Sequence, residues 1–366
     1  MFSVHRSTLL SVVVMLSVAV SAGAVNMTLV KTASGSAPAV APPAGLNWVY
    51  FAHHTHTTYS DGDASVQSRI LEAASFGAQS ISICDHNTFA QCSDPWFIEQ
   101  NGCVPMRAEE WGGMGRGHAS VLNATGDVTM DVRPNGTLYT VEEMISSMLS
   151  RGASIFVNHP FDDGNPWPTP YVQPGIRGVA IWTTPFPNAS ARGWWGGMVN
   201  SGSILVGIGE SDHHIGRVLS TLISNSLVPC NYVLAASHEP ADVQDALEAG
   251  RITIAGSKGG ARAFVWCDQN GDGIYETPMG TNIIVTYSKQ LRFRVEVYGG
   301  ALFGNVMVYS RNGGVKIKSV SGSPCWRIDY LANVNSTTQD YVRAELRDTF
   351  GVLKSLTNPI YVNYVE

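Results

Sequence analysis

Charged residues are scarce in this sequence, and they form no basic cluster or tail. Only 14% of the 366 residues are charged, and the formal net charge is -6. Proteins that bind nucleic acids need grouped lysines and arginines to neutralise the phosphates. We therefore expect no nucleic acid among the partners of this protein.

Long apolar runs are missing after the first two dozen residues. Leu9–Val20 is apolar but too short to cross a bilayer comfortably, and Ala22–Ala24 supplies the small residues that precede a signal-peptidase cut. We predict a signal peptide over 1–24, export of the protein and no stable membrane insertion after cleavage; an uncleaved anchor is the alternative. The Ala-, Ser- and Pro-rich stretch 25–46 is predicted to be a disordered leader.

Several common catalytic and metal-binding motifs are also missing. No CxxC pair occurs, which disfavours a cysteine zinc site, and no GxSxG motif or catalytic Cys–His context supports a covalent nucleophile. The even number of six cysteines favours disulfides in an oxidising compartment, with Cys92–Cys103 as the first candidate pair and Cys267–Cys325 as a second. Glycosylation of an exported protein would use five N-x-S/T sequons, at Asn26, Asn123, Asn135, Asn188 and Asn335.

What is present is an alternation of apolar strands with amphipathic helices. The apolar runs Trp48–Ala52 and Ser80–Cys84 enclose Ala64–Phe76, whose apolar residues lie on one helical face. This order predicts βα units and a largely parallel sheet, hence an α/β domain, over 47–263. Over 264–366, short alternating runs separated by Gly, Asn and Asp predict an antiparallel β-sandwich.

Histidines and carboxylates follow the predicted strands, most densely in Phe51–Gly62, FAHHTHTTYSDG. Alternate residues of an extended chain point to the same side, so His54 and His56 can hold one metal ion together, while His53 is expected to face away from the metals. In βα folds the site lies at the carboxyl ends of the strands. The candidate ligands are His54, His56, Asp61, His86, Glu110, His118, His159, Asp212 and His214.

Nine donors are too many for one ion, because a zinc site needs three or four ligands. They suit two or three divalent ions with bridging carboxylates, and mixed imidazole and carboxylate ligands favour Zn, Mn or Fe. Such ions lower the pKa of bound water and neutralise charge on attacking and leaving oxygens, which predicts hydrolysis by a metal-activated hydroxide. Asp61, His86 or a bound water would protonate the leaving group, and Arg217 is the candidate clamp for an anionic substrate.

The segments HTHTTYSDG, CDHN, EEW with a later GH, NHP and SDHH together resemble the PHP (polymerase and histidinol phosphatase) family of metal-dependent phosphoesterases. LEAGRITIAG and TNPIYV are similar to its CehA-like metallohydrolase branch. The resemblance runs from about Asn47 to the end of the chain. It implies a distorted (β/α) barrel with a trinuclear metal centre, followed by the β-sandwich.

The family pattern falls on particular residues of this sequence. The resemblance implies that His54 and His56 hold the first metal and that Asp61 is the carboxylate of the SDG turn. Glu110 matches the bridging glutamate, with Glu109 as the alternative. The remaining family positions match His86, His118, His159, Asp212 and His214. One departure is the apolar segment VAIWTTP, where that branch often carries a polar or acidic residue.

Three functions are consistent with these observations. The leading prediction is a secreted metal-dependent hydrolase of small phosphoesters. The CehA-like resemblance also permits hydrolysis of a carboxyl ester or carbamate by the same metal centre. The third is a non-catalytic protein that holds metals and binds glycans or surfaces through the β-sandwich.

Overall fold

The computed structural model describes most of the chain after the N-terminal segment. The predicted signal peptide, Arg217 and the sequons at Asn26 and Asn335 lie outside the described residues. Among the residues it describes, no helix is long and apolar enough to cross a membrane. The described residues are 27–36, 41–113, 115–126, 133, 135–162, 164–168, 172–184, 187–215, 228–286, 290–299, 303–311, 313–321, 325–334 and 339–365.

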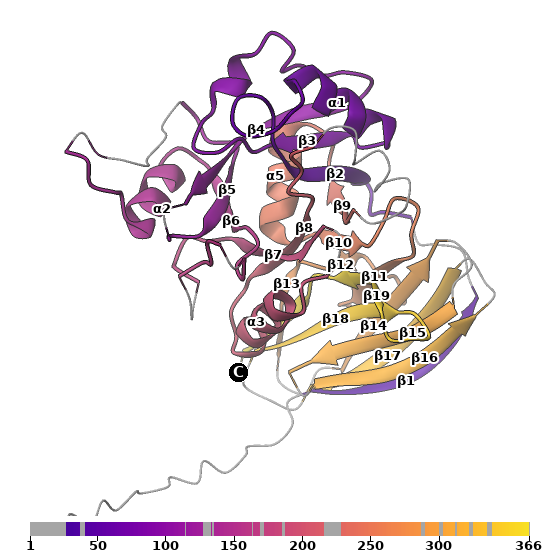
Figure 1. The fold of residues 1–366 in the computed structure, drawn as a ribbon. Coiled ribbons are helices and arrows are strands. Elements are labelled where there is room, and N and C mark those ends of the chain that lie inside the picture. The colour runs from indigo at the N-terminus through magenta and orange to yellow at the C-terminus, as the bar shows by residue number, and fades with distance from the viewer. Residues whose placement is uncertain are drawn as a thin grey trace, which may run out of the picture.

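A large sheet with helices around it carries the first part of the chain (Figure 1). Its strands here are β2 (Asn47–Thr55), β3 (Ser80–Ile83), β4 (Val104–Gly112), β5 (His118–Leu122), β6 (Ser154–Val157), β7 (Gly178–Thr183), β8 (Val206–Glu210), β9 (Cys230–Ala235) and β10 (Ile252–Ala255). The helices described are α1 (Val66–Ser75), α2 (Val141–Leu149), α3 (Ala189–Asn200) and α5 (Pro240–Ala249). The neighbours β2–β3–β4 and β6–β7–β8 are parallel, whereas β5 is antiparallel to both of its neighbours. The predicted mixed α/β fold is confirmed.

Three helix ends carry residues that suit capping positions. Ser65 caps α1 by accepting a hydrogen bond from a backbone N–H, and Thr140 and Glu143 form a reciprocal capping box at the start of α2. At the end of α5, Gly250 has a φ of 74°, the left-handed conformation in which glycine is favoured. These caps supply partners for backbone groups that the first and last helical turns leave open.

The sequence pattern does not predict the helix α3. Gly193, Gly196 and Gly197 make α3 a poor helix by propensity, because each glycine costs about 1 kcal/mol relative to alanine. Packing compensates, since Trp195 is fully buried and its indole N–H donates to the Leu205 carbonyl at 2.8 Å. Tertiary contacts, rather than local preference, therefore determine this helix.

The large sheet curves so that β8, at one end of its path, comes close to β2, β9 and β10, but the described strands do not form a closed barrel. The strand β8 is an edge strand of this sheet, and among the described strands it forms no continuous backbone pairing with β2. Instead, the residues after β8 reach β2 through a single bridge between Thr55 and His213. The backbone N–H of Ser211 also donates to the carbonyl of His53, at 3.0 Å.

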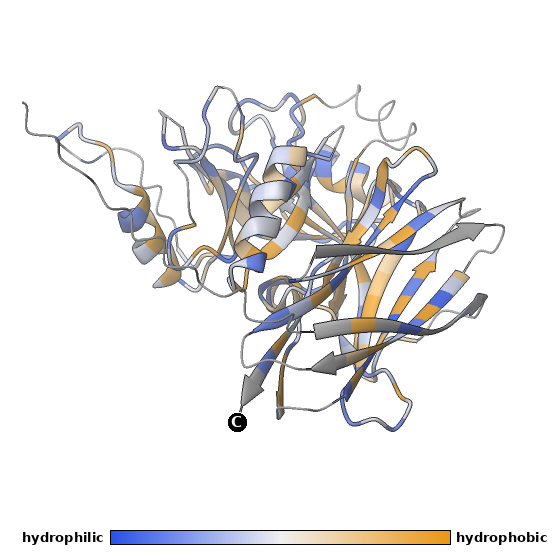
Figure 2. Cartoon of the chain, turned by 90° about the horizontal axis from the view of Figure 1, so that it is seen from below, coloured by the Kyte–Doolittle hydropathy of each residue, from blue (hydrophilic) through white to orange (hydrophobic). Residues whose placement is uncertain are grey.

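The C-terminal strands make two layers around a second hydrophobic core (Figure 1). One layer continues the large sheet from β10 into β19, past the predicted boundary at residue 263, and the other is a five-stranded sheet. In Figure 2, hydrophobic and hydrophilic residues alternate along these strands. Their bounds are β11 (Arg262–Asp268), β12 (Thr277–Pro278), β13 (Asn282–Thr286), β14 (Gln290–Tyr298), β15 (Phe303–Ser310), β16 (Gly313–Ser321), β17 (Cys325–Val334), β18 (Asp340–Arg347), β19 (Leu353–Thr357) and β20 (Ile360–Val365).

The predicted disordered leader is partly wrong, because β1 (Met27–Ser36) is a strand. It pairs antiparallel with β17, from Met27 opposite Val334 to Ser36 opposite Trp326. A small and polar composition hides this strand from sequence reasoning. Its backbone hydrogen bonds come from the open edge of β17, which lies about three hundred residues further along the chain.

No disulfide joins any of the six cysteines, all of which lie within the described residues. Cys92 packs against the main hydrophobic cluster, whereas Cys103 belongs to the smaller cluster under α1. Cys267 and Cys325 lie on β11 and β17, which flank β14 on opposite sides. Two strand spacings of about 4.8 Å exceed the roughly 7 Å that a disulfide can span between α-carbons. Neither predicted pair is formed.

Candidate metal centre

All nine predicted ligands come together at the side of the large sheet where most of its parallel strands have their carboxyl ends. They lie at the end of β2, after β3, near the end of β4, at the start of β5, and after β6 and β8. Because β5 is antiparallel, its first residue reaches the same edge as the ends of the other strands. Three overlapping groups, with ligand atoms within 4.8 Å of one another, are His54–His56–Glu110–Asp212, Glu110–His118–His159 and His56–Asp61–His86–His214.

Glu110 lies at the centre of these groups, and its two carboxylate oxygens face different histidines. Oε1 lies 3.0 Å from His159 Nε2 and 3.4 Å from His118 Nδ1. Burial alone would raise the pKa of Glu110, but the neighbouring histidines, His54 first, hold that pKa well below its usual range. Around Oε2 lie three ring nitrogens, His86 Nδ1 at 3.2 Å, His54 Nε2 at 3.3 Å and His56 Nε2 at 3.4 Å.

Glu109, the alternative from sequence, does not join the cluster. Its side chain is fully buried, and both carboxylate oxygens are without a hydrogen-bond partner among the described residues. Burial raises the pKa of Glu109 to about 8, against the opposing effect of Arg107. Successive residues of a strand point to opposite faces, so only Glu110 can point toward the histidines. The structure thus assigns the shared position to Glu110.

Two of the clustered residues have unusual backbone conformations. His54 and Asp212 have φ angles of 68° and 48°, in a region that residues other than glycine rarely adopt. At His54 this irregularity shifts the pairing of β2 with β3 between Ala52 and Thr55. The two rings of His54 and His56 meet as predicted, with their Nε2 atoms 3.1 Å apart.

The same irregularity turns His53 into the protein interior. Its ring stacks on Phe51 with centroids 5.6 Å apart, and its Nδ1 lies 2.8 Å from Ser82 Oγ. The ring also lines the small cavity beside α1 that is described below, on the side of β2 away from the nine clustered residues. With His54 and Glu210, His53 makes a further group of buried ligand-type atoms that shares His54 with the nine.

Glu210 is a buried site residue that the sequence analysis does not select. Its Oε2 lies 3.1 Å from Nδ1 of His54, and its Oε1 accepts hydrogen bonds from the His159 backbone N–H at 2.9 Å and the Thr183 hydroxyl at 2.7 Å. Burial lowers the pKa of His54, but Glu110 and Glu210 raise that pKa well above its usual value overall. A carboxylate on the second ring nitrogen orients a ligand histidine. The available signal was its position as the last residue of β8.

Arg69 is the second residue that sequence reasoning misses. From α1, its Nε donates to the His56 carbonyl at 2.8 Å and its Nη2 to the His214 carbonyl at 2.8 Å. Arg69 is only 2% exposed, so the sequence pattern of an amphipathic helix gives no sign of this role. The guanidinium of Arg69 therefore links two ligand-carrying segments that lie far apart in the sequence.

The turn that presents Asp61 is held by Asp85. The Asp85 carboxylate accepts hydrogen bonds from the Thr57 backbone N–H at 2.8 Å and from the Ser60 hydroxyl at 2.6 Å. Gly62 closes this turn against the backbone, because a Cβ there would lie 2.5 Å from the His56 carbonyl carbon. Only glycine fits without moving the turn.

The cluster has a buried floor and an open rim. The side chains of His54, His56 and Glu110 are at most 1% exposed, whereas Asp61 is 54% exposed. The other three side chains at the rim are His86, Asp212 and His214, each about 30% exposed. A substrate in solution can therefore reach the rim.

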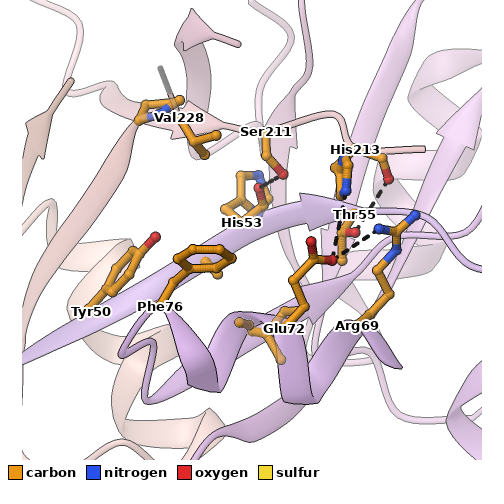
Figure 3. A pocket seen from close by; sticks show the side chains of 13 residues that line it. Tyr50, His53, Thr55, Arg69, Glu72, Phe76, Ser211, His213 and Val228 are labelled. Carbon is orange, nitrogen blue, oxygen red and sulfur yellow. Dashed lines mark hydrogen bonds and ion pairs between the residues drawn. The ribbon is translucent and has the colours of Figure 1, made fainter. Parts of the chain in front are cut away.

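A separate small cavity lies on the other side of β2, next to α1 (Figure 3). Tyr50, Phe76, Glu72 and His213 line it, and His213 Nε2 lies 3.8 Å from Glu72 Oε2. Its volume of about 50 Å³ has room for a few water molecules but not for an organic substrate. His213 is thus directed away from the nine clustered residues.

The donor set fits divalent metal ions. Buried atoms without a hydrogen-bond partner among the described residues include Glu110 Oε2, His118 Nδ1 and His159 Nδ1. An ion bound at about 2.1 Å holds neighbouring ligand atoms about 3.0–3.4 Å apart, which matches most of the distances around Glu110. Imidazoles and carboxylates in this number suit two or three transition-metal ions better than calcium or magnesium.

Comparison with solved structures identifies the fold. No family model matches the sequence, and no curated protein matches it. The chain is similar to a two-domain protein from Bacteroides vulgatus described as containing a predicted PHP-like metal-dependent phosphoesterase. That similarity covers 88% of this chain and 98% of the other, with 16% identity and a TM-score of 0.50.

Two further structures match about half of this chain. One is described as a proposed metal-dependent phosphoesterase from Bifidobacterium adolescentis (13% identity, 48% of this chain and 89% of that one, TM-score 0.37). The other is an amidohydrolase from Chromobacterium violaceum with bound sulfate and no metal (10% identity, 46% and 88%, TM-score 0.35). The match over nearly the whole of both chains shows that this protein has the fold of the two-domain, PHP-like protein from Bacteroides vulgatus.

Proposed function

We propose that this protein is an exported, metal-dependent hydrolase of small phosphoesters. The observation that carries the proposal is Glu110, which has two ring nitrogens within 3.0–3.4 Å of Oε1 and three within 3.2–3.4 Å of Oε2. A carboxylate shared in this way suits a centre of two or three ions, of Zn, Mn or Fe. When bound, such ions supply Lewis acidity and activate water for attack on a phosphoester.

In this proposal the buried residues hold the metal ions, and residues at the exposed rim transfer a proton. His54, His56 and Glu110 would hold the buried part of the centre together with Asp212 from the rim, and Glu210 would orient His54. At the rim, His86 Nε2 lies 3.5 Å from Asp61 Oδ2, and we assign to this pair the transfer of a proton to the leaving oxygen. Arg217, proposed from sequence alone, would contact the anionic group of the substrate.

The setting of the reaction is also part of the proposal. Export rests on the signal-peptide pattern of residues 1–24. The catalytic part would be the distorted barrel implied by the family resemblance, and the C-terminal layers would form the appended β-sandwich. The substrate would be a small molecule, because the rim is open and the sequence carries no basic cluster.

Metal analysis by mass spectrometry, combined with a substrate panel, tests the proposal. The panel contains p-nitrophenyl phosphate, bis(p-nitrophenyl) phosphate, p-nitrophenyl acetate and 1-naphthyl N-methylcarbamate. We expect two or three ions per chain and hydrolysis of at least one phosphoester. Asp212→Ala should lose metal and activity, whereas His238→Ala, which changes a histidine outside the cluster, should retain both. Activity on the carboxyl ester or carbamate alone would contradict the assignment as a phosphoesterase. A full metal complement without turnover of any substrate in the panel would contradict the assignment as an enzyme.

A further inference from the structure

A second and larger cavity lies between α3 and the strands β15 and β18, away from the metal centre. It has a volume of about 390 Å³ and shares no lining residue with the nine clustered ligands. Figure 1 shows α3 lying beside the C-terminal strands at this place. The volume falls within the range of small-molecule binding sites.

The wall of this cavity carries a surplus of positive charge. Four arginines line it, Arg192, Arg311, Arg343 and Arg347, together with a single acidic residue, Glu345. That carboxylate is already engaged, because Oε1 accepts from Arg343 Nη1 at 2.8 Å and Oε2 accepts from Arg347 Nε at 3.0 Å. The Tyr309 hydroxyl also donates to Oε2, at 3.2 Å. Glu345 therefore cannot neutralise the remaining guanidinium groups.

Two of the arginines have unused hydrogen-bond donors. The guanidinium of half-buried Arg192 makes no hydrogen bond or ion pair with any residue that the structure describes. Burial lowers the pKa of Arg192, and Arg347 and Arg343 lower it further against the opposing effect of Glu345. Arg343 is 6% exposed, and its buried Nε has no hydrogen-bond partner among the described residues.

Aromatic rings hold Arg343 in place. Its guanidinium carbon lies 4.1 Å from the centroid of Tyr309 and 5.1 Å from that of Trp195. Such packing over the ring faces stabilises a cation and fixes the plane of its donors. Arg343 is thus a preorganised donor rather than a mobile surface charge.

Three glycines of α3 line the cavity, and at none of them would a larger side chain clash with neighbouring atoms. A Cβ at Gly193 or Gly197 would meet nothing within 4 Å, and one at Gly196 would meet only Arg343 Nη2, at 4.0 Å. None of the three has a positive φ. Each glycine weakens the helix by about 1 kcal/mol relative to alanine, so their shared effect is to leave the space in front of the arginines open.

We propose that this cavity binds a small organic oxyanion, with a phosphate, sulfate or carboxylate group held by Arg192 and Arg343. Guanidinium groups recognise these anions through paired, charge-assisted hydrogen bonds. The body of the ligand would lie along the glycine face of α3, against Tyr309 and Tyr341. The site is independent of the proposed hydrolytic reaction.

Isothermal titration calorimetry of the full-length, metal-containing protein tests the proposal. The probes are phenylphosphonate, benzenesulfonate and benzoate, none of which has an ester bond to hydrolyse, and neutral benzyl alcohol. We expect at least one anion to bind ten-fold or more tightly than the alcohol. The anion that binds identifies which of the three oxyanion groups the site prefers.

Matched variants locate the binding. Arg192→Ala should weaken anion binding about ten-fold or more. Gly193→Leu should abolish it by filling the cavity, and it improves helix propensity, so it should not unfold the protein. Arg292→Ala, an exposed change on β14, and Asp212→Ala in the metal centre should leave this binding intact. The proposal would be contradicted if no anion binds or if benzyl alcohol binds equally well. It would also be contradicted if Asp212→Ala loses anion binding while Gly193→Leu keeps it in full.

Discussion

His159 Nε2 lies 3.0 Å from Oε1 of Glu110, while the other oxygen of the same carboxylate faces a different set of histidines. This relationship makes Glu110 the link between groups that could each hold an ion. We predict that Glu110→Gln removes more than one metal ion per chain and lowers hydrolysis at least about a hundred-fold, because a neutral amide cannot serve two cations. Metal analysis and turnover measurements on the same sample check this outcome.

Asp61 belongs to only one of the three groups, the one at the open rim. We therefore expect Asp61→Asn to lower the metal content by one ion and to leave the ions held around Glu110 in place. Activity should fall sharply, because the variant also loses the rim carboxylate beside His86. A protein that loses all of its metal on this change would show that the groups are not separable.

Glu210 acts on the centre through His54, so its replacement should be milder than the loss of a ligand. Glu210→Gln removes the negative charge 3.1 Å from His54 Nδ1 but keeps an oxygen there. We predict a metal affinity about 10–100-fold weaker, with the same number of ions at saturation. Metal-binding titrations give both quantities, and Thr183→Val is the matched change because it removes a single hydrogen bond to the same carboxylate.

Arg69 should matter in a similar, indirect way. Arg69→Met keeps much of the buried volume but removes the donors to the carbonyls of His56 and His214. We expect the rim group to lose affinity for its ion and the thermal midpoint to fall by several degrees, because the buried His56 carbonyl loses a hydrogen-bond donor and the His214 carbonyl keeps only the Asp63 backbone N–H. Arg292→Ala, on an exposed strand position, controls for the loss of a positive charge.

The sequence was most informative where chemistry follows a strand end. His54, His159 and Asp212 each stand at or just past an apolar run, and a parallel arrangement brings such residues to one edge. Glu210 and Arg69 could not be assigned in that way, because their roles depend on distances between segments remote in the chain. The strand β1 depends in the same way on its pairing with β17, and the glycine-rich helix α3 depends on the burial of Trp195 in the core. Neither contact can be predicted from the local sequence.

Glu109 offers a test that separates stability from the metal centre. Its pKa is about 8 in the folded protein against 4.5 for the unperturbed group, so between these pH values the folded state binds a proton that the unfolded state releases. The free energy of unfolding must then fall as pH rises from about 4.5 to 8, and it levels off above 8. Replacing Glu109 by glutamine abolishes this contribution, because the amide stays neutral in both states.

Urea unfolding of the wild type and Glu109→Gln at several pH values measures the effect. Near pH 4 the two proteins should be nearly equal, and at pH 8 the variant should be more stable by up to about 5 kcal/mol. Both should carry the same metal content, since Glu109 lies outside the cluster. A Glu109→Gln protein that lost its metals, or that gained no stability at pH 8, would show that Glu109 is ionised in the folded protein and serves the site.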